Sequence, residues 1–329
     1  MKKIYLLLSV FAMLFTACET DFDVNAQWEE TTVVYGLLDA SDENPLQKIK
    51  ISKAFLGEMD AYEMAQYSDS INYGVDELDV MIYKWGFSEI EDSVSLNAVP
   101  TARDGDIFND TIVVYEFVNE NLFLQKGYEY ELVGKNNKSG NMVSSRTEIV
   151  SGFDFDNIYR TKNKAFQFGL YNNEDFSSST ITWEDANDNG KIYQLDLIIN
   201  YTEKRGDVYD EKFLTYSLPL VDDSESKMKI EGKSFFNFLE LNLTKDDEVV
   251  RYFNGIDMLM TVGSEDLETY INVNKPITGI VQERPQFTNI NNGIGLFSSR
   301  FKKIRFDYDL TSSTLDYLKS VDGLDRNFQ

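Results

Sequence analysis

Histidine is absent from the 329-residue chain, and there is one cysteine. The absence of histidine excludes Ser-His-Asp and Cys-His catalysis, histidine-ligated zinc or iron, and proton transfer by an imidazole. A single cysteine excludes disulfides within the chain, cysteine-rich zinc sites and the usual iron–sulfur clusters. The chemistry that remains is that of carboxylates and hard cations, or no catalytic chemistry.

Positive charge is also scarce, because 31 basic residues face 56 acidic ones and the net charge is −25. Nucleic acids and anionic lipid surfaces bind proteins through lysine and arginine, so we expect no nucleic-acid partner. The chain is nevertheless 42% hydrophobic and 14% aromatic. This composition predicts a folded protein with proper cores rather than a disordered acidic tail.

The only cysteine, Cys18, follows a sequence typical of an export signal. Met1-Lys2-Lys3 gives a cationic start, Ile4–Phe15 is apolar, and Thr16-Ala17 precedes the cysteine. The apolar run is too short to span a bilayer, and the junction is typical of a bacterial lipobox. We expect residues 1–17 to be a signal peptide and Cys18 to be the lipid-attachment residue. The alternative is a soluble secreted protein whose cysteine falls near the cleavage site by chance.

Lipidation would anchor the mature chain firmly, because each buried methylene contributes about 0.8 kcal/mol. The next residues, Glu19-Thr20-Asp21-Phe22-Asp23, form an acidic stretch that resembles the surface-export signals of lipoproteins from Bacteroidota-type bacteria. We therefore expect an outer-membrane lipoprotein exposed at the cell surface. An anchor that faces the periplasm is the alternative.

The first half of the mature chain reads as a series of β-strands. Short alternating segments lie between Gly, Asn and Asp clusters, as in antiparallel sheets with one solvated face. The spacing predicts an immunoglobulin-like or fibronectin-like β-sandwich over residues 30–150, after a lipidated tether at 18–29. A helical insertion is predicted at Glu58–Tyr67. The predicted strands are Thr31–Leu38, Leu46–Phe55, Leu78–Trp85, Thr111–Phe117, Gly127–Val133 and Met142–Ile149.

The second half reads as another mainly antiparallel β domain with a few short helices. The polar stretch 151–164 is predicted to be a linker, and residues 165–329 the second domain. Its clearest strand is Lys191–Thr202, because Tyr193, Leu195 and Leu197 alternate with polar residues. The other predicted strands are Ala165–Tyr171, Ser178–Trp183, Lys212–Leu218, Gly255–Val262 and Arg300–Leu310. The predicted helices are Ser234–Leu243, Ser264–Ile271 and Ser312–Lys319.

Four segments carry a resemblance to a known family. They are Gln286-Phe287-Thr288-Asn289-Ile290-Asn291-Asn292-Gly293-Ile294-Gly295-Leu296-Phe297-Ser298-Ser299, Gly36-Leu37-Leu38, Trp183-Glu184-Asp185 and Phe235-Phe236-Asn237-Phe238-Leu239. Together with the lipobox, they resemble a Bacteroidota lipoprotein family of unknown function. Its members are often encoded beside TonB-dependent outer-membrane receptors, so the resemblance implies a location and a possible receptor partner. It implies no reaction.

Two glycines in the first of these segments have a physical interpretation. Asn291-Asn292-Gly293 is a turn signal, because Asn and Gly tolerate positive φ. Gly295 is expected to let a neighbouring strand or loop approach closely.

One segment has the spacing of a calcium-binding loop. Asp185, Asn187 and Asn189 stand at its first, third and fifth positions, and Asp196 stands at the twelfth. These four residues are therefore candidate calcium ligands. However, the segment joins two predicted strands, and a strand would carry Asp196 away at about 3.3 Å per residue. The favoured interpretation is a polar hairpin turn.

The basic cluster Arg300, Lys302, Lys303 and Arg305 has two interpretations. It is either a partner-binding patch or, as we favour, a strand whose cations offset neighbouring acids. The three tryptophans are either sugar-stacking platforms or, more commonly, packing residues; they are Trp28, Trp85 and Trp183.

Three tripeptides resemble the Asp-Ser/Thr-aliphatic sequon on which these bacteria O-glycosylate exported proteins. They are Asp69-Ser70-Ile71, Asp92-Ser93-Val94 and Asp110-Thr111-Ile112. Ser70, Ser93 and Thr111 are therefore candidate O-glycosylation residues, although such tripeptides also arise by chance in an acidic β protein.

Three functional hypotheses remain. The first is a lipid-anchored outer-membrane accessory protein that binds a partner or ligand, next to a TonB-dependent receptor. The second is a structural or adhesive surface lipoprotein without a small-molecule ligand. The third is a carboxylate-based hydrolase, for which a glycosidase-like site needs two acids about 5–10 Å apart in a cleft. The sequence names no such pair, so no catalytic residue is predicted, and calcium is the only candidate cofactor.

Overall fold

A computed structural model describes residues 31–41, 45–54, 71–102, 111–150, 152–156, 164–171, 175–184, 186, 189–276 and 286–329. Over these residues the structure is 56% strand with three helices, which confirms the predicted mainly β class. None of the helices described is both long and apolar enough to cross a membrane. The predicted helix Glu58–Tyr67 lies outside the described residues.

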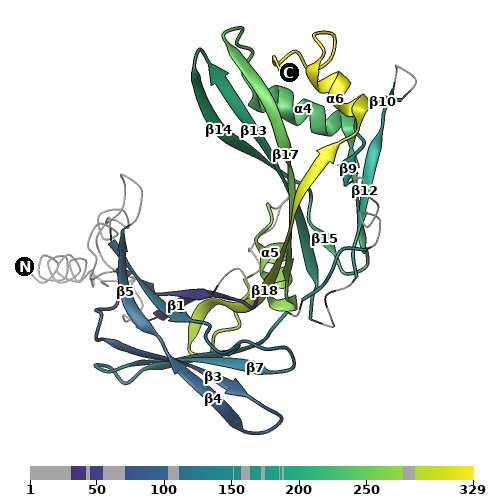
Figure 1. The fold of residues 1–329 in the computed structure, drawn as a ribbon. Helices are drawn as coiled ribbons and strands as arrows, with labels where there is room; N and C mark the ends of the chain where they lie inside the picture. Colours follow the sequence, from purple (N-terminus) through teal and green to yellow (C-terminus); the bar gives the residue numbers. More distant parts are fainter. Residues whose placement is uncertain are drawn as a thin grey trace, which may run out of the picture.

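The largest sheet is mixed and joins the two ends of the sequence (Figure 1). Its strand order is β14-β13-β17-β18-β1-β2-β6-β5, with β15 beside β13 and β9 beside β18. At its centre, β18 pairs antiparallel with β17 and parallel with β1. The bounds of these strands are β1 Thr31–Asp39, β2 Leu46–Ala54, β5 Asn97–Ala102, β6 Thr111–Val118, β9 Ala165–Phe166, β13 Ile192–Arg205, β14 Val208–Ser217, β15 Val221–Asp222, β17 Val249–Gly263 and β18 Gly293–Leu310.

Three smaller sheets and three helices complete the described structure. The four-stranded antiparallel sheet has the order β4-β3-β7-β8, and two-stranded sheets pair β10 with β11 and β12 with β16. The strands are β3 Leu78–Trp85, β4 Ile90–Ser95, β7 Glu129–Asn136, β8 Met142–Glu148, β10 Leu170–Tyr171, β11 Asp175–Phe176, β12 Ser178–Thr182 and β16 Lys227–Glu231. The helices are α4 Gly232–Asn242, α5 Glu265–Asn274 and α6 Ser312–Lys319.

The buried apolar side chains form two clusters, and β18 contributes to both. One cluster lies between the sheet that contains β1 and β2 and the sheet that contains β3 and β7, with Val34, Ile82 and Phe297 among its members. The other lies around β13 and β17 and includes Tyr308 from β18. Helices α4 and α6 lie together at this end of the molecule, where Phe235 joins the second cluster (Figure 1). The predicted division at residues 151–164 stays a prediction.

Alternation identified the buried strands and failed for exposed or fully enclosed ones. In β13, Tyr193, Leu195 and Leu197 are buried as predicted. Strands β4 and β5 were not predicted, because β4 is polar and almost wholly exposed, and β5 has no buried face. The strand that was predicted to begin at Arg300 begins at Gly293 in the structure. The prediction missed its first residues because Leu296 to Ser299 are buried in succession and show no alternation.

Gly295 allows the parallel pairing of β1 and β18. It has a φ of 118° and lies opposite Val34 in the register. A Cβ atom at this position would lie 2.0 Å from the backbone oxygen of Val34. The close approach expected from the sequence at Gly295 is therefore confirmed, and two features, the contact and the positive φ, oppose any larger residue.

We predict that Gly295→Ala lowers the free energy of unfolding by about 3 kcal/mol or more, because it adds a backbone clash to an unfavourable φ. The matched control is Gly140→Ala, since Gly140 also has a positive φ but no atom lies within 4 Å of its Cβ position. That change is expected to cost about 1–2 kcal/mol. Urea unfolding measures both, and equal losses would contradict the proposed close contact.

Candidate functional site

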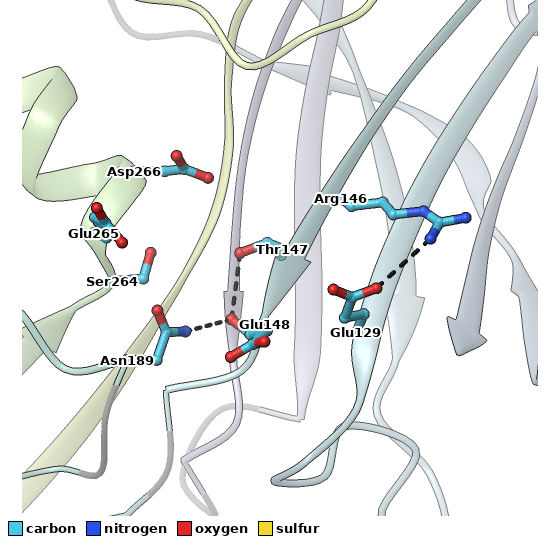
Figure 2. Close-up of a pocket in the computed structure, with 8 residues that line it drawn as sticks. All are labelled: Glu129, Arg146, Thr147, Glu148, Asn189, Ser264, Glu265 and Asp266. Carbon is cyan, nitrogen blue, oxygen red and sulfur yellow. Dashed lines mark hydrogen bonds and ion pairs between the residues drawn. The ribbon is translucent and has the colours of Figure 1, made fainter. Parts of the chain in front are cut away.

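A polar cavity of about 320 Å³ lies between strands β7 and β8 and the N-terminal end of α5 (Figure 2). Strands β7 and β8 form one wall, and the N-terminal end of α5 and the loop before β13 form the other. The residues that line it are Glu129, Arg146, Thr147, Glu148, Asn189, Ser264, Glu265 and Asp266.

Hydrogen bonds at this cavity tie three segments together. The backbone oxygen of Glu148 accepts hydrogen bonds from Asn189 Nδ2 at 2.9 Å and from Thr147 Oγ1 at 3.3 Å (Figure 2). It also accepts one from Ser299 Oγ on β18, and Ser299 Oγ accepts one from the N–H of Val150. These hydrogen bonds therefore hold the loop before β13 and strand β18 against the end of β8.

The charge of this cavity is mainly negative. Its only basic side chain, Arg146, lies 3.6 Å from a carboxylate oxygen of Glu129 and 3.3 Å from one of Glu131. The Arg146 guanidinium also stacks over the ring of Trp85 at 4.2 Å. The cavity therefore suits hydrogen-bond donors or a cation. Among the residues described, however, no group of three or more acidic or cysteine side chains is arranged to hold a metal ion.

A second cavity, of about 390 Å³, follows the C-terminal half of β18 and has the opposite character. We call it the basic edge site. Cationic and apolar side chains are interspersed along it, and Lys164, which lies just before β9, also lines it. The residues that line it are Lys164, Phe301, Lys302, Lys303, Ile304, Arg305, Phe306 and Asp307.

The two arginines of the sequence cluster are neutralised by acids. Arg300 Nε lies 3.0 Å from Asp39 Oδ2, whose side chain is only 1% exposed, and Arg305 forms an ion pair with Asp154. These contacts agree with the interpretation that the cations offset neighbouring acids. The interpretation does not extend to Lys302 and Lys303, which form no ion pair with any residue described.

Asp154 reduces the charge of the basic edge site. Burial alone would raise the pKa of its carboxyl group, but hydrogen bonds from Arg305 and from the N–H of Phe155 outweigh burial. The nearby charge of Lys303 acts in the same direction, so the pKa lies below the ordinary value of 3.8. Asp154 is therefore ionised at neutral pH and compensates Arg305.

The structure describes only part of the predicted calcium loop. Asp185 and Asn187 lie outside the described residues. Asn189 directs its amide nitrogen to the Glu148 backbone, and Asp196 lies within β13, opposite Leu259. One carboxylate oxygen of Asp196 is buried and has no hydrogen-bond partner among the residues described. Calcium binding at this loop stays a prediction.

The remaining predicted residues fall in different settings. Cys18, Ser70 and Trp28 lie outside the described residues. Ser93 on β4 and Thr111 at the start of β6 are exposed, as a glycosylation site requires. Trp183 is only 1% exposed and packs against the ring of Tyr193 in the second apolar cluster, whereas Trp85 lies beside Arg146. Of the two interpretations of tryptophan, packing therefore fits Trp183.

Sequence reasoning missed Lys164 as a member of the basic edge site. Its Nζ lies 3.5 Å from the backbone oxygen of Phe306 and 5.5 Å from the centre of the Tyr308 ring. The two segments are more than 140 residues apart in sequence, and only the pairing of β9 with β18 brings them together. A single basic residue at the end of a predicted linker gave no signal of this contact.

No protein-family model matches the chain, and no curated protein matches it either.

We predict that Asp154→Asn destabilises the protein by about 0.5–1 kcal/mol at pH 7, because the Asp154 side chain is 53% exposed and its ion pair is screened by solvent. A carboxyl group with a lowered pKa contributes stability above its unfolded-state pKa and loses it as the pH falls through the folded-state value. The difference from wild type should therefore shrink as the pH falls below about 4, as urea unfolding would measure. Asp156→Asn is the control, and an identical pH dependence for both variants would contradict the prediction.

Proposed function

We propose that this chain is a lipid-anchored outer-membrane lipoprotein that binds a protein partner, and that the partner is a TonB-dependent receptor. The sequence around Cys18 supports the anchor, and the resemblance described above supports the receptor. The basic edge site supports a binding role. Lys164, Lys302 and Lys303 lie together without an ion-paired acid among the described residues, in a chain whose net charge is −25.

This arrangement of charge is the main observation that supports a binding role. Acids outnumber bases almost twofold in the chain, so a lysine cluster that is left uncompensated is unexpected by composition. Charges at exposed positions act mainly within a Debye length of about 8 Å at physiological ionic strength. At that range Lys164, Lys302, Lys303 and Arg305 outnumber the two nearby acids, Asp154 and Asp307, and the excess of positive charge favours an anionic partner.

We also propose that the chain forms two β domains. An immunoglobulin-like sandwich over residues 30–150 is supported by the apolar cluster that lies between the β1-β2-β6-β5 part of the large sheet and the β4-β3-β7-β8 sheet. A mainly antiparallel second domain is supported by the β14-β13-β17-β18 order. In both proposed domains the strands form a scaffold that holds loops and edges in place for binding.

The alternatives are a structural or adhesive lipoprotein and a carboxylate-based hydrolase. In the polar cavity, four carboxylates line one space of about 320 Å³. One of its four acids, Glu129, pairs with Arg146, and Asp266 accepts a hydrogen bond from Asn289. We therefore favour binding over hydrolysis, and we propose no catalytic residue.

We predict that Cys18→Ser abolishes incorporation of radiolabelled palmitate and moves the protein from the membrane fraction to the soluble fraction, because the acyl chains supply the anchor. Immunoblots of fractionated cells measure the change. A Cys18→Ser protein that stays in carbonate-washed membranes would contradict the lipoprotein assignment. On intact cells, added protease should digest the wild-type protein, and full protection would refute surface exposure.

We also predict that affinity purification of the wild-type protein from detergent extracts of its host co-purifies a large β-barrel receptor. Lys302→Glu/Lys303→Glu should reduce the recovered receptor about tenfold, because it reverses the charge of the basic edge site. Lys126→Glu/Lys135→Glu is the control, since both lysines are exposed, form no ion pair within the described structure, and change the net charge equally. Absence of a barrel from every sample would favour the adhesive alternative.

A further inference from the structure

Strand β18 has two neighbours on one edge, with an open stretch between them. On this edge β1 pairs with residues up to Arg300, and β9 pairs with Asp309 and Leu310. On the opposite edge β17 runs alongside from Arg300 to Tyr308. On the edge that β1 and β9 share, residues Phe301–Tyr308 pair with no strand of the described structure. At about 3.3 Å per residue, this opening is roughly 25 Å long.

The backbone in the opening is directed outward at alternate residues. The N–H of Ser264 donates to the oxygen of Ser299, which shows that odd-numbered residues here face β17. The N–H and C=O groups of Lys302 and Ile304 therefore point to the open edge. Between Arg305 and Tyr308 the register with β17 shifts, and the simple alternation ends there. The oxygen of Phe306 accepts a hydrogen bond from Lys164 Nζ at 3.5 Å. No described residue pairs with the backbone of Lys302 or Ile304.

The side chains around the opening combine positive charge with apolar surface. Lys302, Ile304 and Phe306 lie on one face of the strand, and the Phe306 side chain is 52% exposed. Lys303 and Arg305 lie on the other face, and Lys164 stands at one end. A strand added here would gain main-chain hydrogen bonds from the open edge and side-chain contacts on both of its faces.

We propose that an acidic, extended segment of a partner protein adds to β18 as a strand between β1 and β9. This proposal rests on the binding function proposed above and names the chemistry of the partner. Acidic side chains on one face of the segment complement Lys303, and Lys164 adds positive charge at the end of the opening, while the backbone of the segment completes the sheet. Alternate apolar side chains of the segment pack on Ile304 and Phe306.

Charge also argues against two other occupants. A second copy of this chain would place its own Lys302 and Lys303 against the same lysines, which is how edge lysines prevent sheets from associating with themselves. Residues 157–163, which precede Lys164 in the chain, lie outside the described structure. Their sequence carries Arg160 and Lys162 and no acid, so it would add positive charge to the site.

The test uses the detergent-solubilised full-length protein and a fluorescein-labelled ten-residue peptide of alternating glutamate and valine. Fluorescence anisotropy measures binding. A second peptide has proline in place of every valine, which keeps the charge and removes the ability to pair as a strand. We expect the valine peptide to bind at least about tenfold more tightly than the proline peptide.

Two protein variants locate the site. Ile304→Pro removes one outward-facing N–H and leaves the pairing with β17 intact, and it should weaken peptide binding about tenfold. Thr215→Pro is the matched control, because Thr215 faces outward on β14 at the other edge of the sheet, and it should bind like wild type. Lys302→Gln/Lys303→Gln should also weaken binding, with thermal unfolding as the check that each variant is folded.

The proposal is overturned if wild type binds neither peptide, if both peptides bind equally, or if Ile304→Pro binds the valine peptide as wild type does. Equal binding of both peptides would mean that charge alone attracts them. Because the probe is synthetic, this result is independent of receptor co-purification. If a receptor co-purifies but the peptide does not bind, the proposed function stands and strand addition is refuted. If the peptide binds but no receptor co-purifies, strand addition stands and the proposed receptor partner is refuted.

Discussion

The pairing of β18 with two different strands is the constraint on which the rest of the structure depends. Over its 18 residues it begins beside β1 and continues beside β17. Phe297 near its start is buried in one apolar cluster, and Tyr308 near its end is buried in the other. Because one continuous strand contributes side chains to both clusters, the two clusters are joined through its backbone. The close approach at Gly295 is what allows the first of these pairings.

The sequence predicted those features of the fold that depend on neighbouring residues, such as strands with one buried face. Strand β13 shows a clear alternation, and its buried face follows directly from the order of residues. The start of β18 is different, since Leu296 to Ser299 are enclosed on both faces and carry no periodic signal. The choice of β1 as the parallel partner of β18 joins residues about 260 positions apart, and no local pattern encodes that choice. Strand β4 was missed for the opposite reason, because its exposed, polar sequence resembles a loop.

The same distinction applies to the candidate site. The basic residues from Arg300 to Arg305 were evident in the sequence, but which of them are neutralised was not. Asp39 and Asp154 reach the two arginines because the ends of β1 and the segment before β9 are brought to β18 by the fold. The lysines between them have no acid within ion-pair distance in the described residues. The difference between compensated and uncompensated charge is therefore a tertiary property.

The basic edge site lies on β18, and a hydrogen bond from Ser299 joins the same strand to Glu148 at the polar cavity. At the polar cavity, the carbonyl of Glu148 accepts hydrogen bonds from Asn189 and from Ser299 of β18, so its polar groups are already used to hold the fold. At the basic edge site, β18 is supported by β17 on one side, and on the other side no strand among the described residues pairs with it between β1 and β9. An added strand would support the open side and extend the sheet from β1 to β9. Binding there would therefore stiffen the segment of β18 that connects the two apolar clusters. A partner would thereby fix the position of one cluster relative to the other.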